Sequence, residues 1–422
     1  MTVLPFEAAR HLVEEHARTV RLPDRERIDL LSAAGRVLAE EIHSDRDLPP
    51  FPRATRDGFA VRAEDVAQVP ARLKVVAEIA AGQDVAGISI AAGEAAEIMT
   101  GAPVPDGANA VVMVEHTGPT DGHPPPYGYG RRSPSTGHTV EIQRSIQPGE
   151  NVVPRGSEAR QGQTLLQPGI RLTPAAIAIA ASVGLSNLSV FRQPRVAILA
   201  TGDELVDVSV HPAPHQIRNS NTYSLAAQAA RAGAISAPLP IAPDEETALK
   251  HLIEQGLGSD LLLLSGGVSM GKYDLVEKVL SELGAEFLFT GVHIQPGKPA
   301  VFGRVAHQGQ TKHFFGLPGN PVSTMVTFEL FARPMIEALS GAIPQPLRYA
   351  QAKLKKEVKT KTGLTRFLPA ELTGEFGSLE VELVRWQGSG DIVATARANC
   401  FAVIPPDRER IDAGDTISVL IT

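Results

Sequence analysis

The sequence has few cysteines, few aromatic residues and no long apolar run, and each shortage excludes a class of protein. With one cysteine in 422 residues, Cys400, the chain can form neither an internal disulfide nor a thiolate metal cluster. Aromatic residues make up only 5% of the chain, so a base-stacking platform for nucleic acid is not expected. No apolar run approaches the ~20 residues that span a bilayer, and no signal segment is visible. We therefore expect a cytoplasmic protein that does not enter a membrane.

Positive charge is scarce as well. Forty Lys and Arg residues stand against 47 Asp and Glu residues, which gives a net charge of −7 and argues against nucleic acid as a partner. Anionic ligands remain possible, because metal ions, glycine turns and a few placed cations can hold phosphates locally. The sequence contains no Walker loop, no GxSxG motif and no Ser/His/Asp arrangement suggestive of nucleophilic catalysis.

Residues 261–274, LLLLSGGVSMGKYD, are the most informative stretch that is present. Four consecutive leucines predict a strand buried on both faces, as in a parallel sheet. Ser265, Gly266 and Gly267 then form a tight turn whose backbone N–H groups can converge on an anion. Asp274 follows as an N-cap for a helix to about residue 283. A strand, a glycine turn and a helix N-terminus together form a phosphate site, although such turns are as often purely structural.

The texture of the chain predicts an α/β multidomain protein. From residue 194 to 341 strands alternate with helices, which indicates a parallel sheet covered on both faces, with ligands at the carboxyl ends of its strands. Residues 5–18 and 24–34 have helical spacing, and 174–184 form a short alanine-rich helix. Residues 118–138 read as a low-complexity surface insertion. We predict four domains: a helical stem (1–46 with 148–188), an inserted β domain (47–147), the α/β domain (189–341) and an all-β tail (342–422).

Acidic residues gather at the expected ligand edge. Asp203 and Glu204, in the motif TGDEL that begins at Thr201 and Gly202, directly follow the buried strand VAILA. Paired acids there either cap the next element or hold a hydrated Mg²⁺ that bridges phosphates. Asp244, which we also expect to cap a helix, and Asp274 add carboxylates to the same rim. Because these acids repel one another without a cation, we predict Mg²⁺ on Asp203, Glu204, Asp244 and Asp274, and metal-assisted phosphate chemistry.

Two further loops are candidates for anion binding. Lys298 lies in the sequence QPGKP, where the flanking prolines restrict the backbone, so that little conformational entropy is lost when the lysine binds a phosphate. The alternative is that Lys298 is an ordinary solvated lysine in a turn. Pro318, Gly319 and Asn320 lead into a helix with Pro321 at its first position, which makes a second candidate anion cradle.

These motifs, in this order, resemble the MoeA family, the molybdopterin molybdenumtransferases, to which gephyrin is related. The resemblance runs from DLPPF at residue 47 to the β tail. It implies a MogA-like three-layer α/β/α domain, a helical stem, an inserted β domain, a C-terminal β-barrel and an elongated homodimer. It also implies a Mg²⁺-dependent reaction in which adenylylated molybdopterin and molybdate enter, AMP leaves and molybdenum is inserted at the dithiolene. A MogA-like protein would be a further partner.

The resemblance assigns roles to residues of this chain. Its functional positions fall on Asp57, Thr100, Glu204, Asp244 and Asp274, and its pterin-phosphate turn falls on Ser265, Gly266, Gly267 and Ser269. Lys298 matches its PGKP loop, and Arg366 and Ser389 match its candidates for binding tetrahedral molybdate. The chain departs from the family pattern at Arg56, Phe59 and Glu158, and at Gly291 and Gln295, which are often lysine.

Three other functions are compatible with parts of the sequence. Tungstate, a dianion of nearly the same size as molybdate, is an alternative substrate. A nucleotide pyrophosphatase resembling the CinA family would need neither the DGFA and MTGAPVP motifs nor the β tail. A pterin-binding scaffold without activity would have no reason to keep repelling acids on one rim.

Overall fold

The computed structural model describes residues 2–118, 137–266 and 275–422. They form two compact units, one of residues 1–40, 168–177 and 187–422 and the other of residues 41–167 and 178–186. Gly267, Ser269 and Asp274 lie outside the described residues, as does most of the 118–138 insertion. No helix in the described ranges is long and apolar enough to cross a membrane. The predicted division into four domains stays a prediction.

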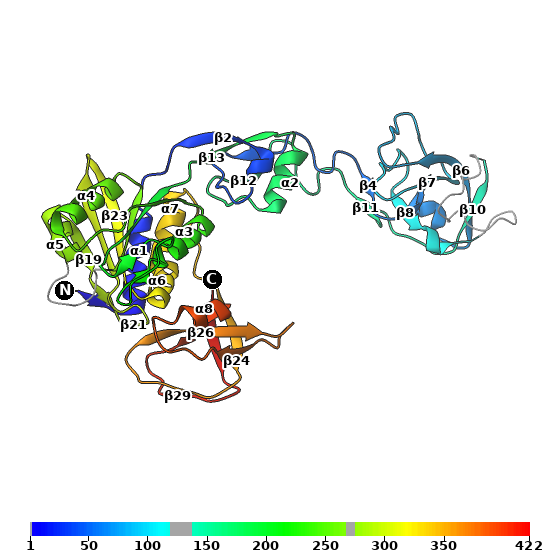
Figure 1. Cartoon of the computed structure of the whole chain (residues 1–422). Coiled ribbons are helices and arrows are strands. Elements are labelled where there is room, and N and C mark those ends of the chain that lie inside the picture. The colour runs from blue at the N-terminus through cyan, green and yellow to red at the C-terminus, as the bar shows by residue number, and fades with distance from the viewer. Residues whose placement is uncertain (1, 119–136, 267–274) are drawn as a thin grey trace. The chain divides into compact units, whose positions relative to one another are not determined.

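The first unit is built on a six-stranded α/β sheet (Figure 1). Five of the six strands run in one direction, and β22 (Val301–His307) alone runs opposite to both of its neighbours, so the expectation of a wholly parallel sheet is wrong for β22. The reason is the two-residue turn at Gln308 and Gly309, both with positive φ, because a hairpin this tight can join only antiparallel strands. In sheet order the strands are β17 (Ile235–Pro238), β14 (Arg195–Ala200), β18 (Leu261–Ser265), β23 (Gln310–Leu317), β22 (Val301–His307) and β19 (Glu286–Phe289).

The register of the parallel strands brings their carboxyl ends together. Ala200 is paired with Ser265, and Ser265 is paired with Leu317. The four leucines of β18 are all buried, as the sequence predicts. The residues that follow β14, β18 and β23 therefore emerge side by side at one edge of the sheet.

Two layers of helices cover this sheet. Alternate residues of the strands pack against α4 (Glu246–Leu257) and α5 (Leu275–Glu282) on one face. The other face packs against α1 (Phe6–Ala17), α3 (Asn221–Arg231), α6 (Pro321–Thr327) and α7 (Arg333–Leu339). The three-layer α/β/α arrangement of the sequence-based expectation is thereby confirmed.

The tail forms a closed β-barrel, as expected. Five strands pair in a ring, because β26 is bonded to both β27 and β28. Phe6 of α1 packs edge-on against Phe367 of the barrel at 5.2 Å and against Phe331 at 6.4 Å between ring centroids. The barrel strands are β24 (Tyr349–Leu354), β26 (Thr365–Thr373), β27 (Glu380–Leu383), β28 (Cys400–Ile404) and β30 (Thr416–Ile421), with the helix α8 (Ile392–Arg397) between β27 and β28.

Arg10 of α1 donates a hydrogen bond to a backbone carbonyl that would otherwise lack its helical partner between α6 and α7, and this gives a testable prediction. The helix passes through a π-helical segment, η4 (Phe328–Ala332), before Pro334, which has no N–H to donate to the carbonyl of Leu330. The Arg10 guanidinium donates to that carbonyl at 2.9 Å. We expect Arg10→Met to lower the free energy of unfolding by about 1–3 kcal/mol, because it leaves a buried carbonyl unpaired. Urea denaturation measures this, and an unchanged midpoint would contradict it.

The helix predicted for residues 24–34 is wrong. Residues 25–29 form the strand β2 (Arg25–Asp29), which pairs antiparallel with β13 (Asn187–Phe191), and residues 30–32 form a short 3₁₀ turn. The partner strand lies about 160 residues away in sequence. The spacing of apolar residues within a short segment cannot reveal a partner so distant in sequence. The pairing with that partner outweighs the local preference for a helix.

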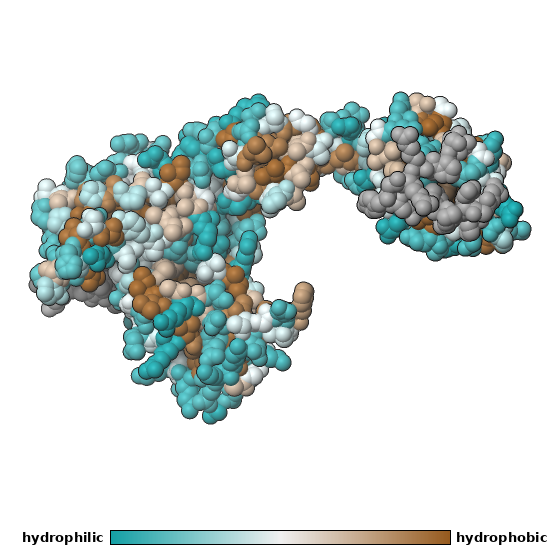
Figure 2. All heavy atoms as spheres, turned by 45° about the vertical axis from the view of Figure 1, so that its right-hand side comes forward, coloured by the Kyte–Doolittle hydropathy of each residue, from teal (hydrophilic) through white to brown (hydrophobic). Residues whose placement is uncertain are grey.

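The second unit is mainly a β structure, as its Val- and Ala-rich texture predicts. Its sheet contains six strands in the order β8, β5, β7, β6, β10, β9. Those strands are β8 (Ala110–Met113), β5 (Gly58–Val61), β7 (Glu94–Ile98), β6 (Ala71–Ile79), β10 (Thr139–Ile142) and β9 (Thr117–Gly118). The predicted alanine-rich helix is α2 (Pro174–Ser182), whose residues are divided between the two units. On the face that Figure 2 shows, hydrophilic and hydrophobic residues are interspersed, as is usual because apolar atoms make up much of a folded protein's surface.

Candidate functional site

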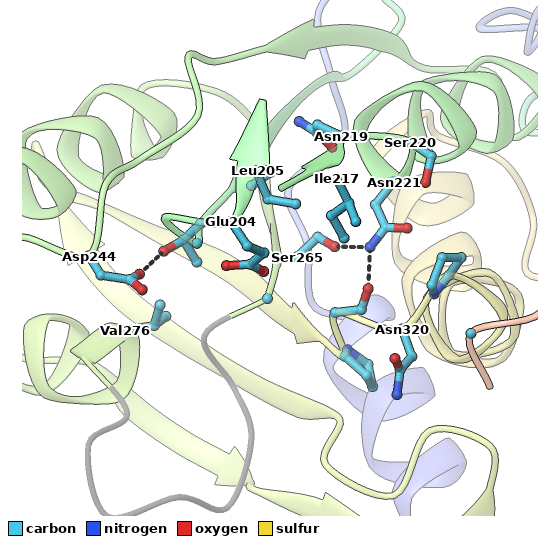
Figure 3. A pocket seen from close by; sticks show the side chains of 18 of the residues that line it. Glu204, Leu205, Ile217, Asn219, Ser220, Asn221, Asp244, Ser265, Val276 and Asn320 are labelled. Atoms are coloured by element: carbon cyan, nitrogen blue, oxygen red, sulfur yellow. Dashed lines mark hydrogen bonds between the residues drawn. The ribbon is translucent and has the colours of Figure 1, made fainter. Parts of the chain in front are cut away.

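A pocket of about 1050 Å³ opens at the carboxyl edge of the parallel strands (Figure 3). That is the edge where open α/β sheets bind ligands, and the volume lies just above the ~300–1,000 Å³ typical of ligand pockets. The pocket brings together predicted residues from four separate loops. Among those that line it are Thr201, Gly202, Glu204, Asp244, Ser265, Gly266, Pro318, Gly319 and Asn320.

Asp244 is held at the rim by two hydrogen bonds. Its Oδ1 accepts from the Thr201 hydroxyl at 3.1 Å, and its backbone N–H donates to Asp203 Oδ1 at 3.0 Å. The expectation that Asp244 caps α4 is wrong, because Glu245 accepts from the N–H groups of Thr247 and Ala248 instead. The capping is thus done by the next residue, and the Asp244 carboxylate faces the pocket (Figure 3).

The turn after β18 has the geometry that only glycine tolerates. Gly266 has a φ of +91°, and a Cβ there would lie 2.6 Å from the carbonyl oxygen of Thr201. Its own N–H donates to the Leu317 carbonyl at 3.3 Å. In the described part of the turn, the hydroxyl of Ser265 is therefore the donor best placed for an anion.

Sequence reasoning missed the contribution of α3 to the pocket. The segment Asn219, Ser220 and Asn221 lines it, and Asn221 Nδ2 donates to both Ser265 Oγ (2.8 Å) and the Gly319 carbonyl (2.7 Å). The N-terminus of a helix favours anions, so α3 adds positive potential here. A run of Asn and Ser before a helix is a signal that could have been used, but it is equally typical of ordinary capping.

The loop before α6 is hydrogen-bonded to Ser389 of the C-terminal region. Asn320 Nδ2 donates to Ser389 Oγ at 3.0 Å, and the N–H of Val322 donates to the Ser389 carbonyl at 3.0 Å. The Ser389 carbonyl therefore already accepts from one of the free N–H groups at the start of α6, so that N–H group is not available to an anion. Ser389 thus lies next to the pocket, since Asn320 and Gly390 both line it.

Arg366 is a buried cation that donates hydrogen bonds to two neutral acceptors. Only 7% of the residue is exposed, its Nε donates to Gln295 Oε1 at 2.8 Å, and its Nη1 donates to the Leu364 carbonyl at 3.1 Å. Burial lowers the pKa of Arg366 from its ordinary value. Gln295, which departs from the family pattern, supplies a neutral acceptor to this guanidinium. Lys298 lies in the same loop and is exposed.

Asp57 and Thr100 form a separate pair in the second unit. Asp57 Oδ1 accepts from the backbone N–H of Thr100 at 2.6 Å. Both residues are exposed, and their predicted role stays a prediction.

The carboxylates of the pocket form only part of a metal site in the described ranges. No group of three or more His, Cys, Asp or Glu residues suited to a metal ion is found in the parts of the chain that the structure describes. Glu204 and Asp244 nevertheless both line the pocket. One or two carboxylates are what Mg²⁺ uses when substrate phosphates and waters complete its octahedron, so these two residues fit a phosphate-bridging Mg²⁺.

A second pocket at the opposite end of the sheet contains a buried histidine. Burial, and then the neighbouring His16 and Arg304, lower the pKa of His313 from 6.5 to about 4. The ring stacks on Phe302 at 5.8 Å, and within the described residues its Nε2 has no hydrogen-bond partner. His313 is therefore buried as the neutral imidazole.

This burial predicts a pH dependence of stability. The unfolded chain binds a proton at His313 below about pH 6.5 and the folded chain does not, so stability is complete above that pH and falls towards pH 4. At pH 4.5 the expected loss is about 2 kcal/mol. Urea unfolding at pH 7 and 4.5 measures it. His313→Phe, which keeps an aromatic ring against Phe302, should reduce the difference between the two values, and an equal pH dependence in both proteins would contradict the assignment.

Comparison with known proteins places these features in one family. The MoeA N-terminal region (domain I and II) matches residues 4–184, the probable molybdopterin binding domain matches residues 197–338, and the MoeA C-terminal region (domain IV) matches residues 351–422. The chain is 35% identical over 404 residues to a molybdopterin molybdenumtransferase of Bacillus subtilis, which covers 94% of this chain and 90% of that protein. A molybdopterin molybdenumtransferase of a Nostoc species is 34% identical over 405 residues, covering 94% and 88%.

Solved structures agree over the full length. A molybdopterin biosynthesis MoeA protein of Pyrococcus horikoshii OT3 superposes with a TM-score of 0.76 at 27% identity and covers 100% of both chains. Another MoeA structure from the same organism has a TM-score of 0.70 at 32% identity and covers 99% of both.

Proposed function

The chain belongs to the MoeA family of molybdopterin molybdenumtransferases, and we propose that it inserts molybdate into adenylylated molybdopterin and releases AMP, with the edge pocket as its active site. The observation that carries the proposal is the convergence of Thr201, Ser265 and Gly319 with the acids Glu204 and Asp244 in one pocket. Hydroxyl and backbone groups suit a phosphate, and acids beside a phosphate require a cation.

Each group has a distinct role in this proposal. The Ser265 hydroxyl donates to the terminal phosphate of the pterin substrate, and the positive end of α3 favours the same charge. Asp244, fixed by Thr201 and by Asp203, accepts a hydrogen bond from the water that attacks the pyrophosphate phosphorus and so orients it. The water oxygen bonds to the adenylyl phosphorus and its proton passes to the Asp244 carboxylate. The bond from that phosphorus to the bridging oxygen breaks, the bridging oxygen stays on the pterin phosphate, and AMP leaves.

Mg²⁺ and molybdate are held by different parts of the first unit. Glu204 and Asp244, with Asp274 of the predicted set, would hold Mg²⁺, which neutralises the phosphate oxygens. Arg366 is the candidate for molybdate, because its hydrogen bonds to the neutral Gln295 and Leu364 oxygens leave its charge uncompensated. Gln295 keeps that guanidinium in place. The homodimer and a MogA-like partner belong to the same proposal.

Release of AMP from adenylylated molybdopterin tests the proposal. The assay contains Mg²⁺ and is run with no oxyanion, with molybdate and with tungstate. We expect AMP release that molybdate stimulates, together with an active cofactor. Stimulation by tungstate alone would make the chain a tungsten insertase. Hydrolysis that no oxyanion affects would favour a pyrophosphatase, and binding without AMP release would leave a scaffold.

A further inference from the structure

We propose that Asn221 is a positioning residue that sets the Ser265 hydroxyl to donate to the substrate phosphate. The inference rests on the proposed function, in which Ser265 holds that phosphate. Asn221 is the first residue of α3, is 9% exposed and hydrogen-bonds both Ser265, the last residue of β18, and Gly319, which follows β23 (Figure 3). No other described side chain is seen to hydrogen-bond both turns.

The two partners fix the orientation of the Asn221 amide. Its Nδ2 has two hydrogens, and both are used, one by Ser265 Oγ at 2.8 Å and one by the Gly319 carbonyl at 2.7 Å. A carbonyl can only accept a hydrogen bond. The nitrogen of the amide must therefore face Gly319, since the oxygen would be repelled there.

This orientation determines what the Ser265 hydroxyl can do. A hydroxyl has one hydrogen to donate and can accept at its lone pairs. Because Ser265 Oγ accepts from Asn221, its hydrogen remains available for an anion in the pocket. The residue is 2% exposed, so water can barely compete for that orientation.

Asn221 does not hold the start of α3, which makes its role separable from helix stability. Asn219 does that instead: its Oδ1 accepts from the N–H of Thr222 at 3.2 Å, and its Nδ2 donates to the Thr222 hydroxyl at 2.8 Å. Removing the Asn221 amide should therefore leave the helix in place.

The same helix offers a matched control. Gln228 also donates twice through its side-chain amide, to the Met325 carbonyl at 3.1 Å and to Glu329 Oε1 at 2.8 Å. It does not line the edge pocket. Gln228→Leu removes two amide hydrogen bonds of α3, as Asn221→Leu does, without touching either turn.

The test measures binding of molybdopterin by calorimetry, the Tm, and KM and kcat for AMP release. We expect Asn221→Leu to raise the Kd and the KM by about 10- to 100-fold, the value of a hydrogen bond to a charged group. Asn221→Asp should weaken binding further, because its carboxylate repels the phosphate and takes the hydrogen of Ser265. Gln228→Leu should lower the Tm comparably and leave the Kd within about twofold of the wild type.

A double-mutant cycle shows whether Asn221 acts through Ser265. We expect Asn221→Leu combined with Ser265→Ala to bind about as weakly as Ser265→Ala alone. Additive losses, or equal Kd values for Asn221→Leu and Gln228→Leu, would overturn the inference. If the wild type binds molybdopterin without releasing AMP, the proposed function fails while the Kd comparison still decides the role of Asn221.

Discussion

Asp244→Asn is expected to lower the rate of AMP release by about 100-fold or more without unfolding the protein. The asparagine Oδ1 can still accept from the Thr201 hydroxyl, and the backbone N–H can still donate to Asp203. Only the negative charge is lost. If that charge orients water and helps to hold a cation, kcat falls while the Tm stays nearly constant. Steady-state kinetics with thermal unfolding measure both quantities.

Glu254→Gln is the matched control for this charge change. Glu254 is an exposed carboxylate on α4 and does not line the edge pocket. Both variants change the net charge of the chain by the same amount, so long-range electrostatics affect them alike. We expect Glu254→Gln to retain wild-type kcat. Full activity in Asp244→Asn would show that the carboxylate has no part in the chemistry.

Gly266→Ala is expected to abolish measurable molybdopterin binding and to cost about 2–4 kcal/mol of stability. The alanine Cβ would lie 2.6 Å from the Thr201 carbonyl oxygen, at a φ of +91°. Backbone cannot yield as a flexible side chain can, so the turn must move. It would carry Ser265 away from Asn221 and Gly319.

Gly284→Ala is the control that separates the effect of the steric clash from the effect of the positive φ angle. Gly284 follows α5 with a φ of +80°, and a Cβ there would meet no atom within 4 Å. This variant should cost about 1 kcal/mol and leave binding unchanged. Calorimetry and urea unfolding of the two variants measure the difference. Equal losses of stability with unaltered binding in Gly266→Ala would contradict a functional turn.

Most of the strand ends and turns that form the pocket can be predicted from the sequence, because short-range residue patterns determine their local structure. Four leucines can form a strand only where both faces are buried, and the glycine turn that follows has few alternatives. The same reasoning correctly places Thr201 at the same edge as Ser265, since the carboxyl ends of parallel strands share an edge and Ala200 pairs with Ser265. The all-β nature of the tail likewise follows from its alternation of polar and apolar residues, whereas its closure into a barrel is implied only by the resemblance to the MoeA family.

What the sequence could not supply are contacts between distant segments. Residues 25–29 form a strand because a partner exists at residues 187–191, and no local feature shows that partner. Asp is a favoured N-cap residue and Glu is not, so the sequence alone favours Asp244 as the cap. In the structure the Asp244 carboxylate accepts a hydrogen bond from Thr201, and Glu245 caps the helix instead. Asn221 belongs to the site only because its amide reaches two turns that are 44 and 98 residues away in sequence.

A crystal structure of the chain with molybdopterin bound tests the central claim most directly. The account predicts electron density for the terminal phosphate within hydrogen-bond distance of Ser265 Oγ, with Glu204 and Asp244 at the same pocket. Density for the pterin phosphate elsewhere, for example in the second pocket beside His313, with the edge pocket holding only solvent, would contradict it.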